Sequence, residues 1–372
     1  MEFAYFHLMP YTEIAESGND WPVANKRFDP AIGTTLYNDY IANMAYAEDC
    51  GFDWIGCNEH HMSPFGMMAN PNLIAAALAQ HTKKAKIAVA GNLVPLLNPL
   101  RVAEEYAMID VMTGGRLIAG MFRGIPHEYV AYNAVADESY SRLSEAINFM
   151  KRAWTEPEPF GWEGKHYQYR AVSIWPRPVQ KPLPRFLMSG SNEKSAELAA
   201  RHGAMLGVAA VTDIGYTKKL IQVYRDTAKE CGWEPQDHDI LIGMLCCVGE
   251  TDKEAVAELE AGRKFFAEVL TGGVRTAQSI VLQKTRYFDD ATRAKFKDVR
   301  QAFGLNVNDM LERGIILAGS ADSVADQVAT LKRELGMGVL NVNMKIGNIP
   351  NDAVRRSMTL FGERVIPEFR AG

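Results

Sequence analysis

The chain has 372 residues, of which 47% are hydrophobic and 23% are charged, and its formal net charge is -5. These proportions are typical of a globular protein with a large apolar core, and they exclude a chain dominated by disorder. No dense basic run is present, so we expect a small-molecule partner rather than a nucleic acid or a membrane surface.

The amino terminus lacks a basic segment followed by a long apolar stretch, and no later run reaches the roughly 18 apolar residues of a membrane span. The cysteines contain no CxxC pair and mostly lie in apolar segments. This pattern predicts reduced, buried thiols rather than a disulfide framework or a zinc site. We therefore expect a cytoplasmic protein. The cysteines are Cys50, Cys57, Cys231, Cys246 and Cys247.

Short apolar runs with the composition of β-strands recur along the chain, and helical periodicity of three and four residues separates them. An alternation of strand and helix that repeats eight times predicts an α/β fold, a single (β/α)8 TIM barrel of parallel strands over residues 1–372. The predicted strands are 3–8, 52–57, 86–91, 116–121, 185–189, 205–211, 240–248 and 339–346.

Four stretches are longer than ordinary loops, and we expect insertions near 10–36, 124–141, 155–184 and 262–318. The third contains a hairpin-like segment around Gly164, followed by a proline-rich run that cannot continue a helix. Within the fourth, residues 272–308 are a candidate lid over the barrel mouth. A helical insertion on the surface is the alternative.

Active sites of such barrels form at the carboxyl ends of the strands. The second predicted strand ends in Asn58-Glu59-His60-His61, and imidazoles beside a carboxylate can transfer protons near neutral pH. Neighbouring side chains of an extended segment point in opposite directions, so the two histidines are poorly placed to bind one metal ion. On spacing alone, a histidine hydrogen-bonded at the barrel rim fits the motif equally well.

The next two strands end in residues that suit a flat, phosphorylated ligand. Gly91 and Asn92 interrupt an apolar stretch, which allows either close approach of the backbone to a planar cofactor or a β-bulge. Arg123 follows the fourth strand, where its guanidinium can meet a phosphate or a neighbouring carboxylate.

Small polar residues follow the fifth strand and open a helix. The free N–H groups and the positive dipole end of a helix amino terminus can hold a phosphate monoester. Serine and asparagine are also the commonest N-caps, so an ordinary cap is the alternative. The residues concerned are Gly190, Ser191, Asn192 and Ser195.

Taken in order, these segments resemble the luciferase-like flavin monooxygenase family, from residue 3 to about residue 367. The resemblance implies that His60 lies beside the reactive edge of the flavin and that His61 faces the barrel wall. It also implies a cofactor site and a non-proline cis peptide at Gly91-Asn92. The matching stretches are 48–61, 70–73, 98–105, 114–117, 190–195 and 319–322. The implied cofactor site consists of Glu59, Gly91, Asn92 and Gly190, with Arg123, Ser191, Asn192 and Ser195 at the phosphate.

The resemblance further implies a monooxygenase that uses reduced FMN and O2 to oxygenate a small organic substrate, with His60 as the catalytic residue. A separate NAD(P)H:flavin reductase would supply the reduced flavin, and a homodimer or homotetramer is expected. Phe122 stands where bacterial luciferase carries a reactive cysteine, so light emission is not expected. Hydroxylation, Baeyer–Villiger insertion and carbon–heteroatom cleavage are all compatible with these residues.

Aromatic and methionine side chains near the expected mouth, Phe6, Met9, Met62 and Phe65, are candidates for a substrate pocket, and each fits a core position as well. Other functions share the Glu59-His60 pair. One is hydride transfer with a deazaflavin, in which oxygen takes no part, and another is flavin binding without catalysis. A metal-dependent hydrolase would instead contain stoichiometric zinc.

Overall fold

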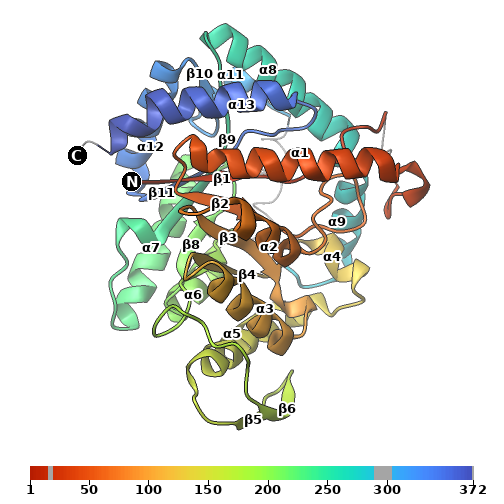
Figure 1. The fold of residues 1–372 in the computed structure, drawn as a ribbon, viewed down its shortest axis with the longest axis vertical. Helices are drawn as coiled ribbons and strands as arrows, with labels where there is room; N and C mark the ends of the chain where they lie inside the picture. Colours follow the sequence, from red (N-terminus) through yellow and green to blue (C-terminus); the bar gives the residue numbers. More distant parts are fainter. Residues whose placement is uncertain (16–19, 289–303, 371–372) are drawn as a thin grey trace.

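The structure, a computed structural model, describes residues 1–15, 20–288 and 304–370. Eight parallel strands close into a barrel, because β8 pairs with β9 as well as with β7. The predicted (β/α)8 barrel is therefore confirmed (Figure 1). The barrel strands are β1 (Glu2–Phe6), β2 (Trp54–Cys57), β3 (Lys86–Leu93), β4 (Leu117–Phe122), β7 (Phe186–Ser189), β8 (Met205–Val208), β9 (Ile240–Val248) and β11 (Val339–Asn343).

The barrel interior is packed by a layer to which each of the eight strands contributes one buried side chain. Successive side chains of a strand point to opposite faces, so their neighbours along each strand pack outward against the helices. The layer consists of Ala4, Trp54, Ala88, Ile118, Leu187, Met205, Leu241 and Val339.

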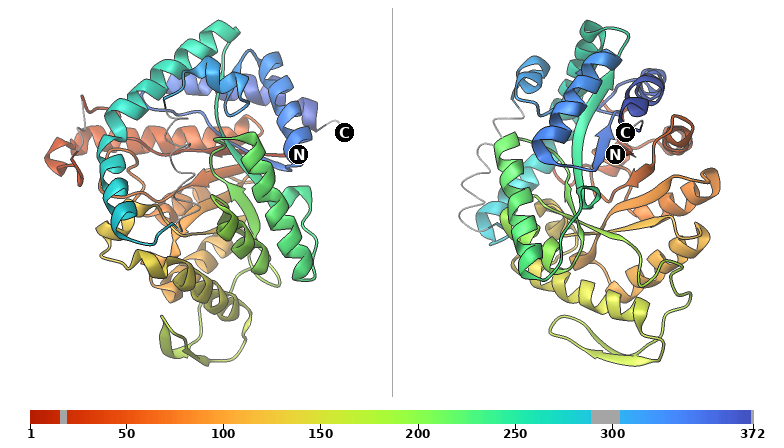
Figure 2. Two further views of the ribbon diagram at one scale, coloured as in Figure 1. Left: turned by 180° about the vertical axis from the view of Figure 1, so that it is seen from behind. Right: turned by 90° about the vertical axis from the view of Figure 1, so that its left-hand side faces the viewer.

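Helices surround the barrel on its outside, as the views of Figure 2 show. Several begin with an Asp or Asn N-cap followed by proline. The side chain of the cap accepts hydrogen bonds from free N–H groups, and the proline presets the backbone of the first turn. The Asp29 carboxylate accepts from Ala31 N at 2.8 Å, for example. No helix in the described part of the chain is long and apolar enough to span a membrane. The covering helices are α1 (Pro30–Asp49), α2 (Pro71–His81), α3 (Pro99–Met112), α5 (Ser139–Thr155), α6 (Glu193–Arg201), α7 (Ile214–Glu230), α8 (Asp252–Phe265), α12 (Ala321–Leu335) and α13 (Asn351–Leu360).

The stretches expected to be insertions contain further helices and strands. β5 (Phe160–Glu163) and β6 (Gln168–Val172) form an antiparallel hairpin that projects from the barrel, with Gly164 N donating to Tyr167 O, so the predicted hairpin is confirmed (Figure 1). α4 (Pro126–Ala131) follows β4, and α9 (Gly272–Lys284) and α11 (Val307–Glu312) lie within the fourth stretch.

A short strand, β10 (Leu317–Gly319), pairs with the end of β9 outside the closed circle, and it was not predicted because three residues show no periodicity. Of the candidate lid at 272–308, the part from 289 to 303 lies outside the described residues.

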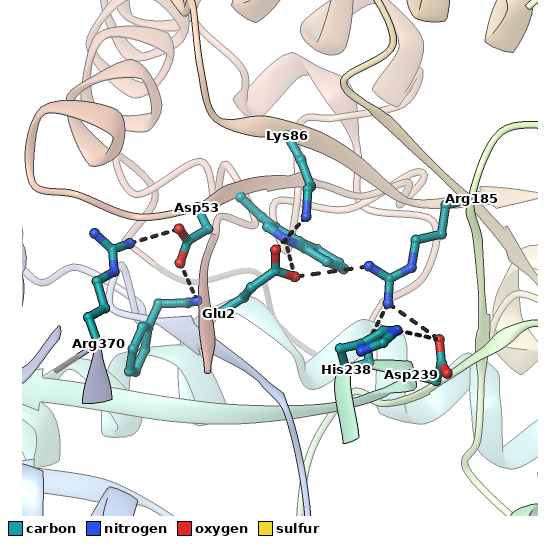
Figure 3. A network of polar contacts seen from close by, with 9 residues as sticks. Glu2, Asp53, Lys86, Arg185, His238, Asp239 and Arg370 are labelled. Atoms are coloured by element: carbon teal, nitrogen blue, oxygen red, sulfur yellow. Dashed lines mark hydrogen bonds and ion pairs between the residues drawn. The ribbon is translucent and has the colours of Figure 1, made fainter. Parts of the chain in front are cut away.

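Ion pairs join the amino-terminal ends of the strands, at the face opposite the predicted active site (Figure 3). Glu2 pairs with Lys86 and accepts from the Trp54 indole N–H at 3.2 Å. Arg185 lies 4.0 Å from Glu2 and 3.4 Å from Asp239. Near the adjacent chain termini, Arg370 pairs with Asp53 at 2.7 Å (Figure 1). Each of these carboxylates therefore faces at least one cation.

Candidate active site

A cavity of about 340 Å³ is lined by the residues that follow the barrel strands and by part of the inner layer. Its upper wall comes from the ends of β2, β4, β7 and β8, and its floor includes Trp54 and Leu187. Most of this wall is apolar. Its polar lining residues include Glu59, His60, Arg123, Glu128, Ser191 and Ser195, and all of these except Glu128 were predicted site residues.

His60 forms a hydrogen-bonded pair with Glu128, a residue that the sequence did not suggest. Nδ1 of His60 lies 3.0 Å from Oε1 of Glu128, and the Glu128 side chain is fully buried. The other oxygen of Glu128 accepts from Ile125 N at 2.7 Å, because Glu128 occupies the first turn of α4. This pairing occupies Nδ1 and leaves Nε2 as the ring nitrogen for a ligand.

The protonation of the pair follows from its burial. Burial lowers the pKa of His60 to about 3, with the neighbouring His61 acting in the same direction. Burial also raises the pKa of Glu128 well above its usual value. Both shifts favour an uncharged pair, in which the Glu128 carboxyl donates to Nδ1 and Nε2 of His60 carries a proton.

Glu59 and His61 form a second hydrogen-bonded pair beside His60. His61 Nε2 lies 2.9 Å from a Glu59 oxygen, and the ring packs edge-on against Tyr132. The second Glu59 oxygen accepts from Leu93 N at 2.9 Å. Glu59 lines the cavity, and it also ties the end of β2 to the end of β3.

The third strand contains both features that the sequence left as alternatives. The register between β3 and β4 shifts between Val89 and Asn92, which is a β-bulge, and Gly91 lines the cavity. A Cβ on Gly91 would lie 2.7 Å from the Phe122 ring, so only glycine fits here. Asn92 points elsewhere, and its amide donates to Asn72 at 3.0 Å.

The non-proline cis peptide lies at Ala90–Gly91, so the expected position at Gly91-Asn92 was wrong by one bond. The expectation had been transferred from the resemblance, and a sequence does not record the isomer of an individual peptide bond.

Arg123 packs against two tyrosine rings. Its guanidinium carbon lies 3.7 Å from the centroid of Tyr287 and 4.2 Å from that of Tyr140. Nη1 donates to Tyr287 O at 2.9 Å and to Ser139 Oγ at 3.3 Å. In residues 1–15, 20–288 and 304–370, no carboxylate forms an ion pair with Arg123. A buried guanidinium of this kind is available to a phosphate.

The start of α6 combines a helix cap with side chains that line the cavity. Asn192 and Ser195 cap each other, since the Asn192 amide oxygen accepts from Ser195 N at 2.9 Å and the Ser195 hydroxyl lies 3.0 Å from Asn192 N. Tyr140 donates to the same Asn192 oxygen at 3.0 Å, which links this cap to Arg123. Ser191 and Ser195 line the cavity, whereas Gly190 packs against Leu206 of β8.

The predicted substrate residues are distributed over different sites. Phe6 lines both the main cavity and a second one of about 310 Å³, and Phe65 lines the second, with its ring 4.5 Å from that of His60. Met62 is half exposed and lines a third cavity of about 280 Å³. Met9 is fully buried in the main core and lines none of these three cavities, which fits the core alternative.

Three residues of this site were missed in the sequence: Glu128, Tyr140 and Tyr287. The Pro126–Glu128 segment carries a local signal, an acidic residue in the first turn of a helix, but nothing in it points to His60, 68 positions away. The two tyrosines come from separate insertions and meet only around Arg123.

Known proteins share the sequence pattern of this chain. The profile of a family described as luciferase-like monooxygenase matches residues 23–338. The alkanal monooxygenase alpha chain of Photorhabdus luminescens is 24% identical over 253 residues, which cover 68% of this chain and 67% of the relative. The oxygenase component of flavin-dependent trigonelline monooxygenase from Acinetobacter baylyi is 29% identical over 176 residues, or 46% of this chain and 48% of that protein. The chain thus spans about half the length of this second relative.

Solved structures share the barrel. The oxygenating constituent of 3,6-diketocamphane monooxygenase from Pseudomonas putida, in complex with FMN, superimposes with a TM-score of 0.76 at 18% identity and 99% coverage of both chains. A secondary alcohol dehydrogenase that depends on coenzyme F420 gives a TM-score of 0.70 at 18% identity, also with 99% coverage of both. At these identities the likeness shows a common fold.

Proposed function

The chain belongs to the luciferase-like monooxygenase family, and from this premise we propose that it is an oxygenase that uses reduced FMN and O2 to oxygenate a small organic substrate. One observation carries the proposal. A single cavity has a guanidinium without a carboxylate partner among the described residues on one wall and the buried His60–Glu128 pair on another. A cation suits the phosphate of flavin mononucleotide, and a proton-holding group suits the chemistry at its ring.

The residues present fit FMN. Gly91, where a side chain would collide with Phe122, supplies a surface on which a flat ring can lie, and Arg123 with Ser191 and Ser195 would hold the phosphate. Free N–H groups at the start of α6 would add to the phosphate site. When bound, reduced FMN supplies the electrons that activate O2.

The chain itself would control protons and water. Glu128 fixes the His60 ring through Nδ1, so the proton on Nε2 has a defined position for hydrogen bonding or transfer. Phe65 packs edge-on against His60, and Phe6 lies where the first and second cavities meet. These rings would keep water from the reacting atoms.

A flavin reductase that uses NAD(P)H is the proposed partner, because the relative from Acinetobacter baylyi is named an oxygenase component and the structure from Pseudomonas putida an oxygenating constituent. We propose that this pair works in the cytoplasm, where NAD(P)H is supplied. We also propose a homodimer or homotetramer, since Leu73 of α2 and Met108 and Met112 of α3 are exposed apolar side chains on neighbouring helices.

The test combines the purified chain with FMN, NADH and an NADH:FMN reductase. We expect oxygen uptake and transfer of 18O from 18O2 into product across a panel of small apolar and sulfur-containing compounds. Because one structural neighbour depends on coenzyme F420, a deazaflavin, a parallel arm supplies reduced F420 without oxygen. Oxygen-independent turnover in that arm would replace the monooxygenase with a hydride-transfer enzyme. Tight FMN binding without turnover in either arm would indicate a flavin-binding protein.

A further inference from the structure

The second cavity adjoins the proposed flavin cavity and shares four lining residues with it, Phe6, His60, Ala209 and Asn341. It has a volume of about 310 Å³, which is enough for a small organic molecule. Its wall is mostly apolar and comes from β9, α8, the π-helical turn Phe266–Leu270 and α11. Apolar lining side chains are Leu8, Phe65, Met244, Leu245, Phe266, Met310 and Ile315.

One cation, Arg263, stands in this apolar wall. It lies in the last turn of α8 and is partly buried, and its Nη1 donates to Leu305 O at 3.1 Å. No described carboxylate forms an ion pair with it. Glu260, one turn earlier on the helix, accepts from Val307 N at 2.7 Å and attracts Arg263 electrostatically without forming an ion pair. A partly buried cation of this kind gains free energy from an anionic ligand.

The position of Arg263 is fixed by close packing. A Cβ on the preceding residue, Gly262, would lie 2.5 Å from Ile346 O, so α8 presses against the segment that follows β11. The same end of β11 supplies Asn343, which lines the cavity and is 8% exposed. Its amide oxygen has no hydrogen-bond partner within the described part of the chain. Because an amide can be turned to present either its oxygen or its NH2 group, Asn343 is a second polar group suited to a ligand.

We infer that the second cavity binds the organic substrate and that Arg263 selects a substrate with an apolar body and a carboxylate. The inference rests on the proposed function, since it assigns the substrate to the space beside the flavin cavity. The apolar body would lie against Met244 and Phe266, with His60 at the junction of the two cavities. The carboxylate would meet the guanidinium of Arg263, and Asn343 would bind a further polar atom.

The experiment measures binding rather than turnover, by calorimetry with the FMN-loaded protein. The probes are three matched pairs of carboxylate and primary amide: phenylacetate, 3-phenylpropionate and octanoate, each with its amide. We expect at least one carboxylate to bind about tenfold or more tightly than its amide, as a charge-assisted hydrogen bond predicts. Arg263→Met should abolish this preference and leave amide affinity within about twofold. Arg263→Lys should retain part of the preference because it keeps the charge.

Lys264→Met is the matched control, because it removes the same charge from the next residue of α8, which is exposed and lines none of the three cavities. It should leave every affinity unchanged. The unmodified protein alone can overturn the inference. It does so if acid and amide bind equally in all three pairs, or if no probe binds. FMN affinity, measured in parallel, separates the two proposals. FMN binding without a preference for the carboxylate refutes only the role of Arg263. Failure to bind FMN refutes the proposed function.

Discussion

The amino-terminal and carboxyl-terminal ends of the barrel strands differ in how their charged side chains are partnered. At the amino-terminal ends, Glu2 faces both Lys86 and Arg185 (Figure 3). At the carboxyl-terminal ends, Arg123 is buried against aromatic rings and Arg263 lies in an apolar wall, and neither has a carboxylate partner among the described residues. Charges that face one another serve the fold, and charges that face a cavity are available to a ligand.

The energetics of the two ends differ accordingly. The ion pairs of the amino-terminal face are partly exposed, so each contributes about 0–1 kcal/mol to the free energy of unfolding. Arg123 and Arg263 have hydrogen-bond partners but no carboxylate partner among the described residues, so no ion pair offsets the cost of taking their charges out of water. The carboxyl-terminal face therefore gives up stability for a function, and substitutions at the two ends should affect different quantities.

The largest expected effect is on turnover. His60→Asn should lower substrate oxygenation about 100-fold or more, because it removes the group that holds a proton at the cavity. FMN affinity and the melting temperature should change little. His81→Asn, on the exposed end of α2, is the control and should retain full activity. Unchanged oxygenation by His60→Asn, measured as 18O incorporation, would remove His60 from the chemistry.

The next effect is on cofactor binding. Arg123→Met should weaken FMN binding about 10- to 100-fold, as the loss of charge-assisted hydrogen bonds predicts. Its free energy of unfolding without FMN should stay equal or rise, since a buried cation without a carboxylate partner in the described residues is removed. Arg185→Met at the opposite end is the matched control and should leave the FMN dissociation constant unchanged. Equal losses of FMN affinity in both variants would contradict the assignment of FMN binding to the carboxyl-terminal end of the barrel.

A smaller effect concerns acid stability. His127 is fully buried beside Glu128, neither ring nitrogen has a partner among the described residues, and burial lowers its pKa from 6.5 to about 3. A group whose pKa is lower in the folded chain stabilises it above the unfolded pKa, and this contribution is lost as the pH falls from 6.5 towards 3. By pH 5, one such histidine has lowered the free energy of unfolding by about 2 kcal/mol.

His127→Phe should therefore reduce the fall in the free energy of unfolding between pH 7 and pH 5 by about that amount, measured by urea denaturation. His238→Gln is the control, because His238 is largely exposed in the network at the amino-terminal face. If the two variants lose stability equally on acidification, the burial of His127 has no such consequence.

The smallest effect is at the amino-terminal face. Glu2→Gln removes the carboxylate that faces Lys86 and Arg185 and should lower the free energy of unfolding by about 1 kcal/mol. The loss should shrink in 1 M salt, because partly exposed ion pairs are screened. FMN affinity and oxygenation should not change. A measurable loss of oxygenation would show that the two ends are coupled.

The sequence by itself determined the features that depend on neighbouring residues. Apolar runs and helical periodicity predicted the eight barrel strands, with ends displaced by a few residues, and Gly164 marked the hairpin. The motif at 58–61 placed a histidine at the end of β2, and the small polar residues at 190–195 marked the start of α6. These features follow from local backbone and side-chain preferences, which short stretches of chain already contain.

Only the tertiary structure decided which of these residues act together. Glu128 forms a hydrogen bond with His60, which lies 68 positions away in the sequence. Tyr140 and Tyr287, from two different insertions, both pack against Arg123. Partners so distant in the chain meet because the closed barrel brings the ends of all its strands to one face. Burial then sets the protonation of the His60–Glu128 pair, and burial is a property of the assembled fold rather than of any segment of the sequence.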